Sequence, residues 1–154
     1  MRSDILTLRN SPGSASEFLS TFYDRENHAL GGIEILKILI VEDDEELLNG
    51  LDIILTKEGY GVLRTSEGET GLDIVVREKP NLIILDTALP GISGLDMCRE
   101  LRGQGVKTPI ILMSAKADAM DRRTGSYPDV NEYIAKPFGW RELLSCVRTQ
   151  LHDI

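Results

Sequence analysis

Five short runs of apolar, β-prone residues recur along the chain, and stretches with helical spacing of apolar residues separate them. The runs are continuous and rich in Ile, Leu and Val. Such runs are typical of parallel strands that are buried on both faces of a sheet. The pattern therefore predicts strands at residues 37–41, 60–64, 81–85, 109–113 and 131–135.

Capping and turn residues mark the helices between these strands. Asp44 is placed to cap a helix that Gly59 ends, and Ser93 is placed to cap another. Ser66 and Glu69 have the spacing of a capping box, in which each side chain bonds to the backbone of the other. The pattern predicts helices at residues 44–58, 66–78, 94–102, 118–126 and 139–151.

The alternation of strands and helices across short loops predicts parallel strands joined by right-handed crossovers. The expected fold class is α/β: a flavodoxin-like, doubly wound, five-stranded parallel sheet with helices on both faces. We expect the strand order 2-1-3-4-5, which places the first and third strands side by side. Their carboxyl ends then share the crevice in which open α/β sheets bind ligands.

The chain divides near residue 35. Residues 1–34 are rich in Ser, Asn and Gly and form an N-terminal extension, whereas residues 35–154 form the globular domain. Phe18, Leu19 and Phe22 recur at helical spacing in the extension. Two interpretations stand: a short amphipathic helix that docks on the domain or on a partner, or a partly disordered leader.

Composition narrows the classes of function. The chain of 154 residues has a formal net charge of −8 and a pI of about 4.8, which argues against direct nucleic-acid binding. No apolar run approaches the roughly 18 residues that cross a bilayer, and the first residues have no sustained apolar stretch, so we expect no secretory signal. Cys98 and Cys146 lie far apart without metal-ligand spacing, so we expect reduced thiols in a cytoplasmic protein.

Charged residues follow three of the predicted strands. The run Glu42-Asp43-Asp44 follows the first strand, Asp86 the third and Lys136 the fifth. Because the carboxyl ends of parallel strands lie at one edge of a sheet, we expect these side chains to meet. Several carboxylates beside one ammonium group call for a divalent cation and offer a place for a phosphate.

These residue types suit phosphoryl transfer. Asp43 and Asp86 supply the hard oxygen ligands that Mg²⁺ takes together with waters and phosphate oxygens. An ionised Asp86 can act as a nucleophile and form an acyl phosphate. Lys136 and the hydroxyl of Ser114, which closes the fourth strand, are placed to neutralise the charge on the phosphoryl oxygens.

Each of these residues also has a purely structural explanation. Acidic side chains favour any helix N-terminus through the helix dipole, and Lys136-Pro137 is ordinary turn chemistry. Asp86 and Ser114 could each serve as a cap or turn residue. Their joint placement at strand ends favours the functional interpretation, because structural context separates a motif from chance.

The same segments resemble the receiver domain of two-component response regulators over residues 36–152. Residues 38–44 (ILIVEDD) resemble the first strand and acidic pair of that family, and residues 81–94 (NLIILDTALPGISG) its phosphoacceptor strand and loop. Residues 113–115 (MSA) resemble its switch segment, and residues 133–138 (YIAKPF) its aromatic, lysine and proline ending. The four motifs in this order make the resemblance specific.

The resemblance implies a phosphoacceptor and a metal site. Asp86 would accept a phosphoryl group from a histidine kinase or a phosphotransfer protein. Mg²⁺ would be the cofactor, held by Asp43, Asp86 and the backbone carbonyl of Ala88, with Glu42 acting through water.

The resemblance also implies a switch. Lys136 and Ser114 would bind the phosphoryl group, and Ser114 and Tyr133 would form the switch pair. Ser114 would move toward the added charge and Tyr133 would turn inward. The Lys136–Pro137 bond would be cis.

The implied protein is a signalling protein whose only reactions are its own phosphorylation and dephosphorylation. Its partners would be the phosphodonor, a downstream protein target and, in a homodimer, a second copy of the chain, with no nucleic acid and no membrane. Because the last predicted helix ends close to Ile154, we expect a receiver without an output domain. The alternative is the receiver fragment of a DNA-binding transcriptional response regulator.

Two places set this chain apart within the resemblance. Residues 126–130 (SYPDV) replace the usual Leu-x-x-Gly-Ala ending of the fourth helix, and Pro128 would shorten that helix. The change affects the expected dimer face and signal readout, not the phosphorylation site. Ala88 is small, so we expect it to leave the phosphoryl group open to water.

Other classes of function fit less well. A haloacid-dehalogenase-type phosphatase needs a second carboxylate two residues after its aspartate, where this chain has Ala88. A flavodoxin-like electron carrier would place a flavin phosphate against the acidic residues that follow the first strand. A P-loop nucleotidase needs a Gly-x-x-x-x-Gly-Lys run, which the sequence lacks.

Overall fold

The computed structural model describes residues 34–115 and 129–152. Within these residues, five parallel strands form one sheet in the order β2-β1-β3-β4-β5, which confirms the predicted order. The strands are β1 (Lys37–Val41), β2 (Gly61–Thr65), β3 (Leu82–Asp86), β4 (Ile110–Ala115) and β5 (Glu132–Lys136). The first and third strands are therefore neighbours, as expected for the crevice at the switch point of the winding.

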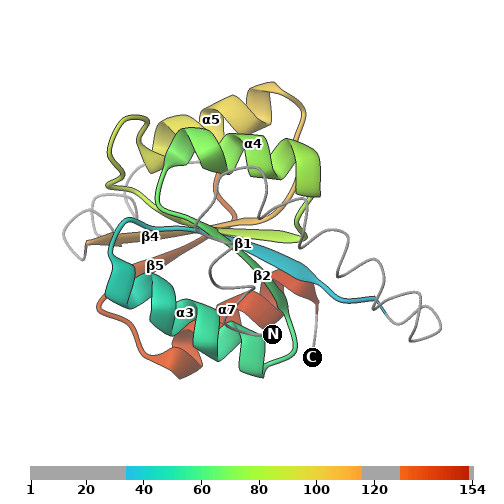
Figure 1. Ribbon diagram of the computed structural model, residues 1–154, viewed down its shortest axis with the longest axis vertical. Helices are drawn as coiled ribbons and strands as arrows, with labels where there is room; N and C mark the ends of the chain where they lie inside the picture. Colours follow the sequence, from blue (N-terminus) through green and yellow to red (C-terminus); the bar gives the residue numbers. More distant parts are fainter. Residues whose placement is uncertain (1–33, 116–128, 153–154) are drawn as a thin grey trace.

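Helices cover both faces of the sheet (Figure 1). On one face lie α3 (Glu45–Lys57) and α7 (Trp140–Leu151), and on the other lie α4 (Gly68–Glu78) and α5 (Gly94–Gly103). This is the predicted doubly wound α/β architecture. None of the helices in the described ranges is long and apolar enough to cross a membrane.

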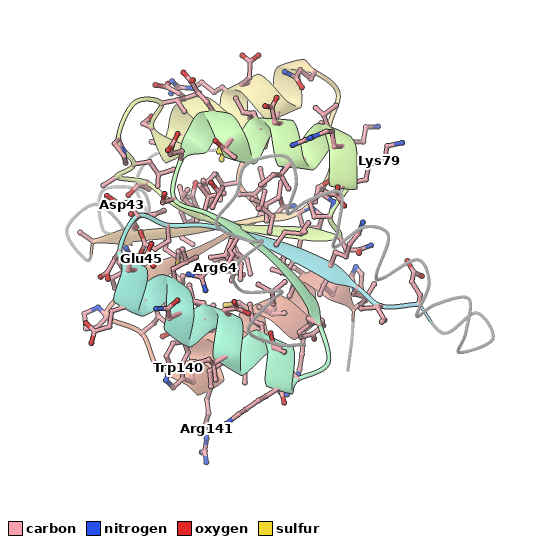
Figure 2. All side chains as sticks on the ribbon, in the orientation of Figure 1. Asp43, Glu45, Arg64, Lys79, Trp140 and Arg141 are labelled. Atoms are coloured by element: carbon pink, nitrogen blue, oxygen red, sulfur yellow. The ribbon has the colours of Figure 1, made fainter. Side chains whose placement is uncertain are left out.

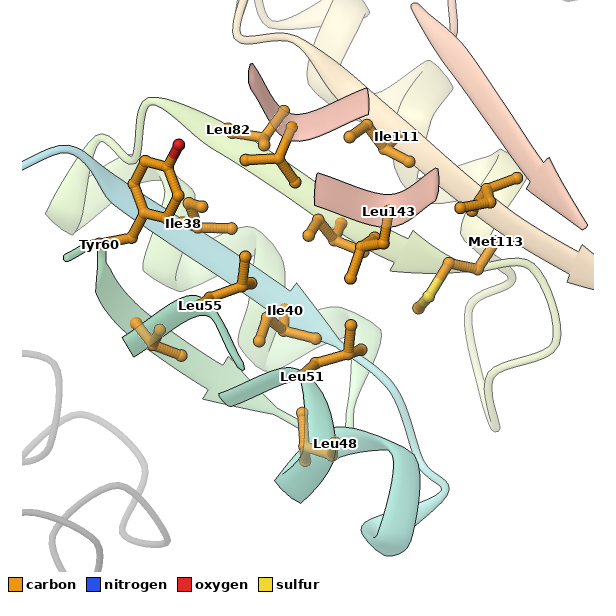
Figure 3. Close-up of a cluster of buried hydrophobic side chains, with 14 residues drawn as sticks. Ile38, Ile40, Leu48, Leu51, Leu55, Tyr60, Leu82, Ile111, Met113 and Leu143 are labelled. Carbon is orange, nitrogen blue, oxygen red and sulfur yellow. The ribbon is translucent and has the colours of Figure 1, made fainter. Parts of the chain in front are cut away.

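The strands contribute side chains to two hydrophobic clusters, because successive side chains of a strand point to opposite faces of the sheet. Ile38 and Ile40 of β1 pack in the cluster under α3 and α7, which Figure 3 shows. Leu39 and Val41 pack in the cluster under α4 and α5. Each such buried side chain stabilises the fold by about 1.5–3 kcal/mol. The packed sheet gives the polar residues at its strand ends a rigid base.

Four of the five strands begin one residue later than predicted and end one or two residues later. The added residues still belong to the hydrogen-bonded ladder: Thr65 pairs with Val41, Asp86 with Met113, and Lys136 with Ala115. Polar side chains ended the apolar runs in the sequence, but the backbone continues as strand to the edge of the sheet. The candidate site residues thus lie on the strand ends themselves.

The helix ends follow the sequence signals except at α4. Asp44 caps α3 by accepting from the N–H groups of Glu46 and Leu47, and Ser93 caps α5. The capping box of Ser66 and Glu69 was a wrong prediction, because the cap residue is Glu67 and it makes no side-chain cap bond. Since β2 extends to Thr65, the helix starts one residue too late for the box to close.

Some predictions fall outside the described residues. These are the helix at residues 118–126, the effect of Pro128, and the apolar pattern of Phe18, Leu19 and Phe22 in the extension. They stay predictions from the sequence.

Candidate functional site

The carboxyl ends of β1 and β3 bring three carboxylates together. Val41 pairs with Leu85, so Glu42 and Asp86, the next residues along each chain segment, lie at the same edge. One side-chain oxygen from each of Glu42, Asp43 and Asp86 lies within 4.8 Å of the other two. The structure therefore brings together the acidic residues that the strand pattern singled out.

The three carboxylates differ in their contact with solvent. Glu42 is fully buried, Asp86 is 4% exposed, and Asp43 is exposed. The backbone N–H of Asp43 donates to Oε2 of Glu42 at 3.0 Å, which fixes the turn after β1. Figure 2 places Asp43 on the loop between β1 and α3. The group of three carboxylates is thus open to solvent at Asp43 and closed to solvent at Glu42 and Asp86.

Lys136, at the end of β5, crosses the sheet edge to reach two of these carboxylates. Its Nζ lies 2.6 Å from Oε1 of Glu42 and 3.2 Å from Oδ1 of Asp86. The contact with Asp86 was predicted. The shorter contact with Glu42 was not, because nothing in the sequence tells which acid of the run Glu42-Asp43-Asp44 points inward.

Burial governs the electrostatics of this pair. Burial, followed by the hydrogen bond with Asp86, raises the pKa of Glu42 to about 7, although Lys136 acts in the opposite direction. Burial alone would lower the pKa of Lys136, but the hydrogen bonds and charges of Glu42 and Asp86 more than offset it and raise that pKa. The ammonium group is therefore firmly protonated, and burial makes the ionised form of Glu42 costly.

Ser114 is a buried hydroxyl without a partner in the described part of the chain. It is fully buried, and its Oγ makes no hydrogen bond there. It follows Met113, which pairs with Asp86 across β3 and β4. A buried hydroxyl without a partner costs about 1–3 kcal/mol, so a native structure keeps one only for a reason such as a ligand.

The remaining predicted site residues surround this edge. Ala88 is exposed two positions beyond Asp86. Tyr133 of β5 is half-buried against the cluster under α4 and α5. The Lys136–Pro137 bond is cis, as the resemblance implied.

A cavity of about 500 Å³ adjoins Lys136, between the start of α3 and the start of α7. Leu47, Phe138 and Trp140 are among its lining residues. The rings of Phe138 and Trp140 meet edge to face, with centroids 6.0 Å apart. The cavity was not predicted, because its walls come from three segments that only the folded chain brings together.

Comparisons with known proteins agree with this geometry. The profile of the family described as "Response regulator receiver domain" matches residues 38–148. Response regulator ArlR of Staphylococcus aureus (strain COL) is 44% identical over 115 residues, which cover 75% of this chain and 52% of ArlR. The chain belongs to the response regulator receiver domain family. It spans about half the length of the curated relatives it matches.

Solved structures share the fold. A putative response regulator from Chloroflexus aurantiacus is 33% identical, with a TM-score of 0.71, and the match covers 77% of this chain and 99% of that one. Response regulator protein TrrA from Thermotoga maritima is 32% identical, with a TM-score of 0.69, over 76% of this chain and 100% of that one. The TrrA structure is a complex with Mg(2+)-BeF.

Proposed function

We propose that Asp86 is the phosphoryl acceptor of this receiver domain and that a histidine kinase or a phosphotransfer protein is the donor. The observation that carries the proposal is the position of Asp86. Its nearly buried carboxylate lies 3.2 Å from the ammonium group of Lys136 and belongs to a group of three acids. A carboxylate oxygen can form an acyl phosphate, and an ammonium group at this distance can offset charge on a phosphoryl oxygen.

Mg²⁺ is the cofactor that we propose for the acidic group. Asp43, Asp86 and the backbone carbonyl of Ala88 would hold it, with Glu42 acting through water. The donors fit, because Mg²⁺ prefers hard oxygen ligands, and the hydroxyl of Ser114 without a partner fits a site that receives a phosphoryl oxygen. When bound, Mg²⁺ supplies positive charge that offsets the charge of the carboxylates and the phosphoryl group. The relative TrrA was solved with Mg(2+)-BeF.

In the proposed step, an oxygen of Asp86 forms a bond to phosphorus while the bond between phosphorus and the donor breaks. The leaving atom of the donor, an imidazole nitrogen in a phosphohistidine, keeps the electron pair. Lys136 shifts its contact from Asp86 to a phosphoryl oxygen, and Ser114 donates its hydroxyl to another. These donors stabilise the charge that develops in transfer.

The proposed output is a change of packing at one face. Movement of Ser114 toward the phosphoryl group vacates buried space, and Tyr133 turns inward to fill it. Since both packings use the same fold, phosphorylation shifts a population between them. A downstream protein, or a second copy of the chain, reads the altered face. We propose residues 35–154 as the unit that carries this activity in the cytoplasm.

A second candidate is that this receiver acts within a longer response regulator of the transcriptional type. The observation that favours it is the coverage of ArlR, of which the matched segment makes up 52%. Mass spectrometry of the protein isolated from its native cells tests this second candidate, because it requires a chain longer than 154 residues.

The acceptor is tested by incubating the protein with acetyl phosphate and Mg²⁺ and measuring intact mass. We expect the wild type to gain one phosphoryl group and Asp86→Asn to gain none. Asp73→Asn, which changes an exposed aspartate of α4, is the matched control and gains one. Phosphorylation of Asp86→Asn to the wild-type extent would show that another residue is the acceptor.

The lifetime of the phosphoryl group is tested at Ala88. Since Ala88 is small and exposed beside the acceptor, we expect Ala88→Asn to shield the acyl phosphate from water and slow its hydrolysis. The measurement is the loss of the phosphorylated mass after the donor is removed. An unchanged half-life discards this role of Ala88.

A further inference from the structure

Gly94, the first residue of α5, lies against the backbone of the acceptor residue. Its N–H donates to the carbonyl oxygen of Thr87 at 3.1 Å. A Cβ atom at Gly94 would lie 2.2 Å from the carbonyl oxygen of Asp86 and 2.9 Å from Cα of Thr87. Contacts under 3.0 Å are essentially never made by real Cβ atoms, so a side chain at this position must displace the backbone of Asp86.

A second glycine holds the other end of the acceptor loop, residues 87–93. A Cβ atom at Gly68, the first residue of α4, would lie 2.4 Å from Cγ2 of Ile92 and 3.2 Å from its carbonyl oxygen. Ile92 itself packs against the cluster under α4 and α5. The loop therefore packs closely against α4 at Gly68 and against α5 at Gly94.

These two contacts matter for the position of Asp86, because the acceptor loop begins directly after Asp86 at the end of β3. The carboxylate of Asp86 already has a close partner, with Oδ1 3.2 Å from Nζ of Lys136. Because aspartate has a short side chain, a shift of its backbone carries the carboxylate with it. A displacement of the 86–87 peptide therefore moves the carboxylate away from Lys136 and from the other two acids.

We propose that Gly94 and Gly68 are positioning residues for phosphoryl acceptance: their missing side chains let the acceptor loop hold Asp86 against Lys136 and the acidic group. The inference rests on the proposed function of Asp86. Neither glycine touches the phosphoryl group, and both act through the backbone of the loop.

The experiment compares Gly94→Ala and Gly68→Ala with Gly103→Ala, the matched control. Gly103 is the last residue of the same helix as Gly94, and a Cβ atom there would meet nothing within 4 Å. The rate of phosphorylation by acetyl phosphate is measured at increasing acetyl phosphate and Mg²⁺ concentrations. Each rate is divided by the folded fraction from a urea unfolding curve of the same variant, so that lost stability does not enter.

We expect Gly94→Ala to lower the rate at saturating acetyl phosphate and Mg²⁺ by about 100-fold, since a misplacement of about 1 Å can cost this much. Gly68→Ala should lower it less, because its nearest contact is a methyl group of Ile92 and not the backbone of Asp86. Gly103→Ala should keep the wild-type rate. A purely structural role would leave the saturated rate per folded molecule unchanged in every variant.

The inference is overturned if Gly94→Ala and Gly68→Ala both react at the wild-type rate per folded molecule. That outcome leaves the proposed function standing, because the wild type is still phosphorylated. If Gly94→Ala does not fold, Gly68→Ala decides, and a reduced rate supports the inference while an unreduced one overturns it. A folded wild type that takes up no phosphoryl group overturns the proposed function, and the inference with it.

Discussion

Among the described residues, Lys136 is the one whose ammonium group contacts two of the three site carboxylates. Without it, two buried acids would face each other with no positive charge from residues 34–115 or 129–152 between them. Removing one partner of a buried ion pair is strongly destabilising, and part of the cost is relieved here because the Lys136 side chain is 27% exposed. Its contribution should therefore be visible in stability as well as in phosphorylation.

We predict that Lys136→Met lowers the free energy of unfolding of the metal-free protein at pH 8 by about 2–3 kcal/mol. Urea denaturation followed by circular dichroism measures the change. Lys107→Met, which alters an exposed lysine, is the control and should stay within about 0.5 kcal/mol of the wild type. Equal losses in the two variants would mean that the ion pairs of Lys136 contribute nothing to stability.

Cys146 of α7 allows a test of pH dependence away from the site. Burial, followed by the charges of Glu132 and Glu142, raises the pKa of the Cys146 thiol above its ordinary value of 9.0. A raised pKa leaves less thiolate at a given pH, and the thiolate is the reactive form. Cys98 is fully buried and should not compete.

We predict that the rate of iodoacetamide reaction with Cys146 in the folded protein rises with a midpoint above pH 9.0. Glu132→Gln removes one nearby negative charge and should move the midpoint down. Glu69→Gln, an exposed carboxylate on another helix, should leave it unchanged. Peptide mass mapping of the alkylated protein gives the rates. A midpoint at or below pH 9.0 contradicts the assigned environment.

At the level of single residues, the sequence singled out the residues of the candidate site but not the contacts among them. Asp86, Lys136 and Ser114 stood out because each follows or ends an apolar run. The inward turn of Glu42 and the tight approach of Gly94 depend on how segments pack after folding. Local pattern carries no signal for such contacts.

Among the elements, Arg102 of α5 holds the start of β5 through a set of hydrogen bonds, which we call the clasp. Its guanidinium donates to the carbonyl oxygens of Val106, Thr108 and Asp129, at 2.9–3.0 Å. It also donates to Oδ1 of Asn131, which accepts the N–H of Ile110 as well. The clasp thus ties α5 to the starts of β4 and β5.

We predict that Arg102→Met lowers the free energy of unfolding by about 2–3 kcal/mol, because several part-buried carbonyls lose a charged donor. Arg99→Met is the matched control on the same helix. Arg99 pairs only with exposed Asp96 among the described residues, so its loss should cost less than about 0.5 kcal/mol. Urea unfolding measures both, and similar losses for the two arginines would refute the clasp.

The elements themselves were largely readable from the sequence. Continuous apolar runs and caps such as Asp44 and Ser93 gave the strands and most helix starts. The one-residue extension of β2, β3 and β5 was missed because polar residues occupy the last ladder positions. The same extension misplaced the capping box of Ser66 and Glu69, since Glu67 became the cap. The errors in element bounds therefore lie mostly at the edge of the sheet where the strands end in candidate site residues.

At the scale of the whole molecule, the two clusters that surround the sheet draw on residues from Ile38 to Val147. We predict that removal of residues 1–34 changes the free energy of unfolding by less than about 1 kcal/mol and leaves labelling by acetyl phosphate intact. Urea unfolding and intact mass test the two parts. A loss above about 2 kcal/mol would instead favour docking of the apolar pattern at Phe18 and Phe22 on the domain.

The ion pair between Lys136 and Glu42 spans 94 positions of the chain. A polypeptide emerges from the ribosome with its N-terminal end first, so the acids are made well before the lysine. A nascent chain lacking its fifth strand would hold the acidic group without the ammonium that completes it. Competence for the proposed phosphoryl acceptance would then arise only when synthesis has passed this lysine, and unfinished chains would not react with the proposed phosphodonor.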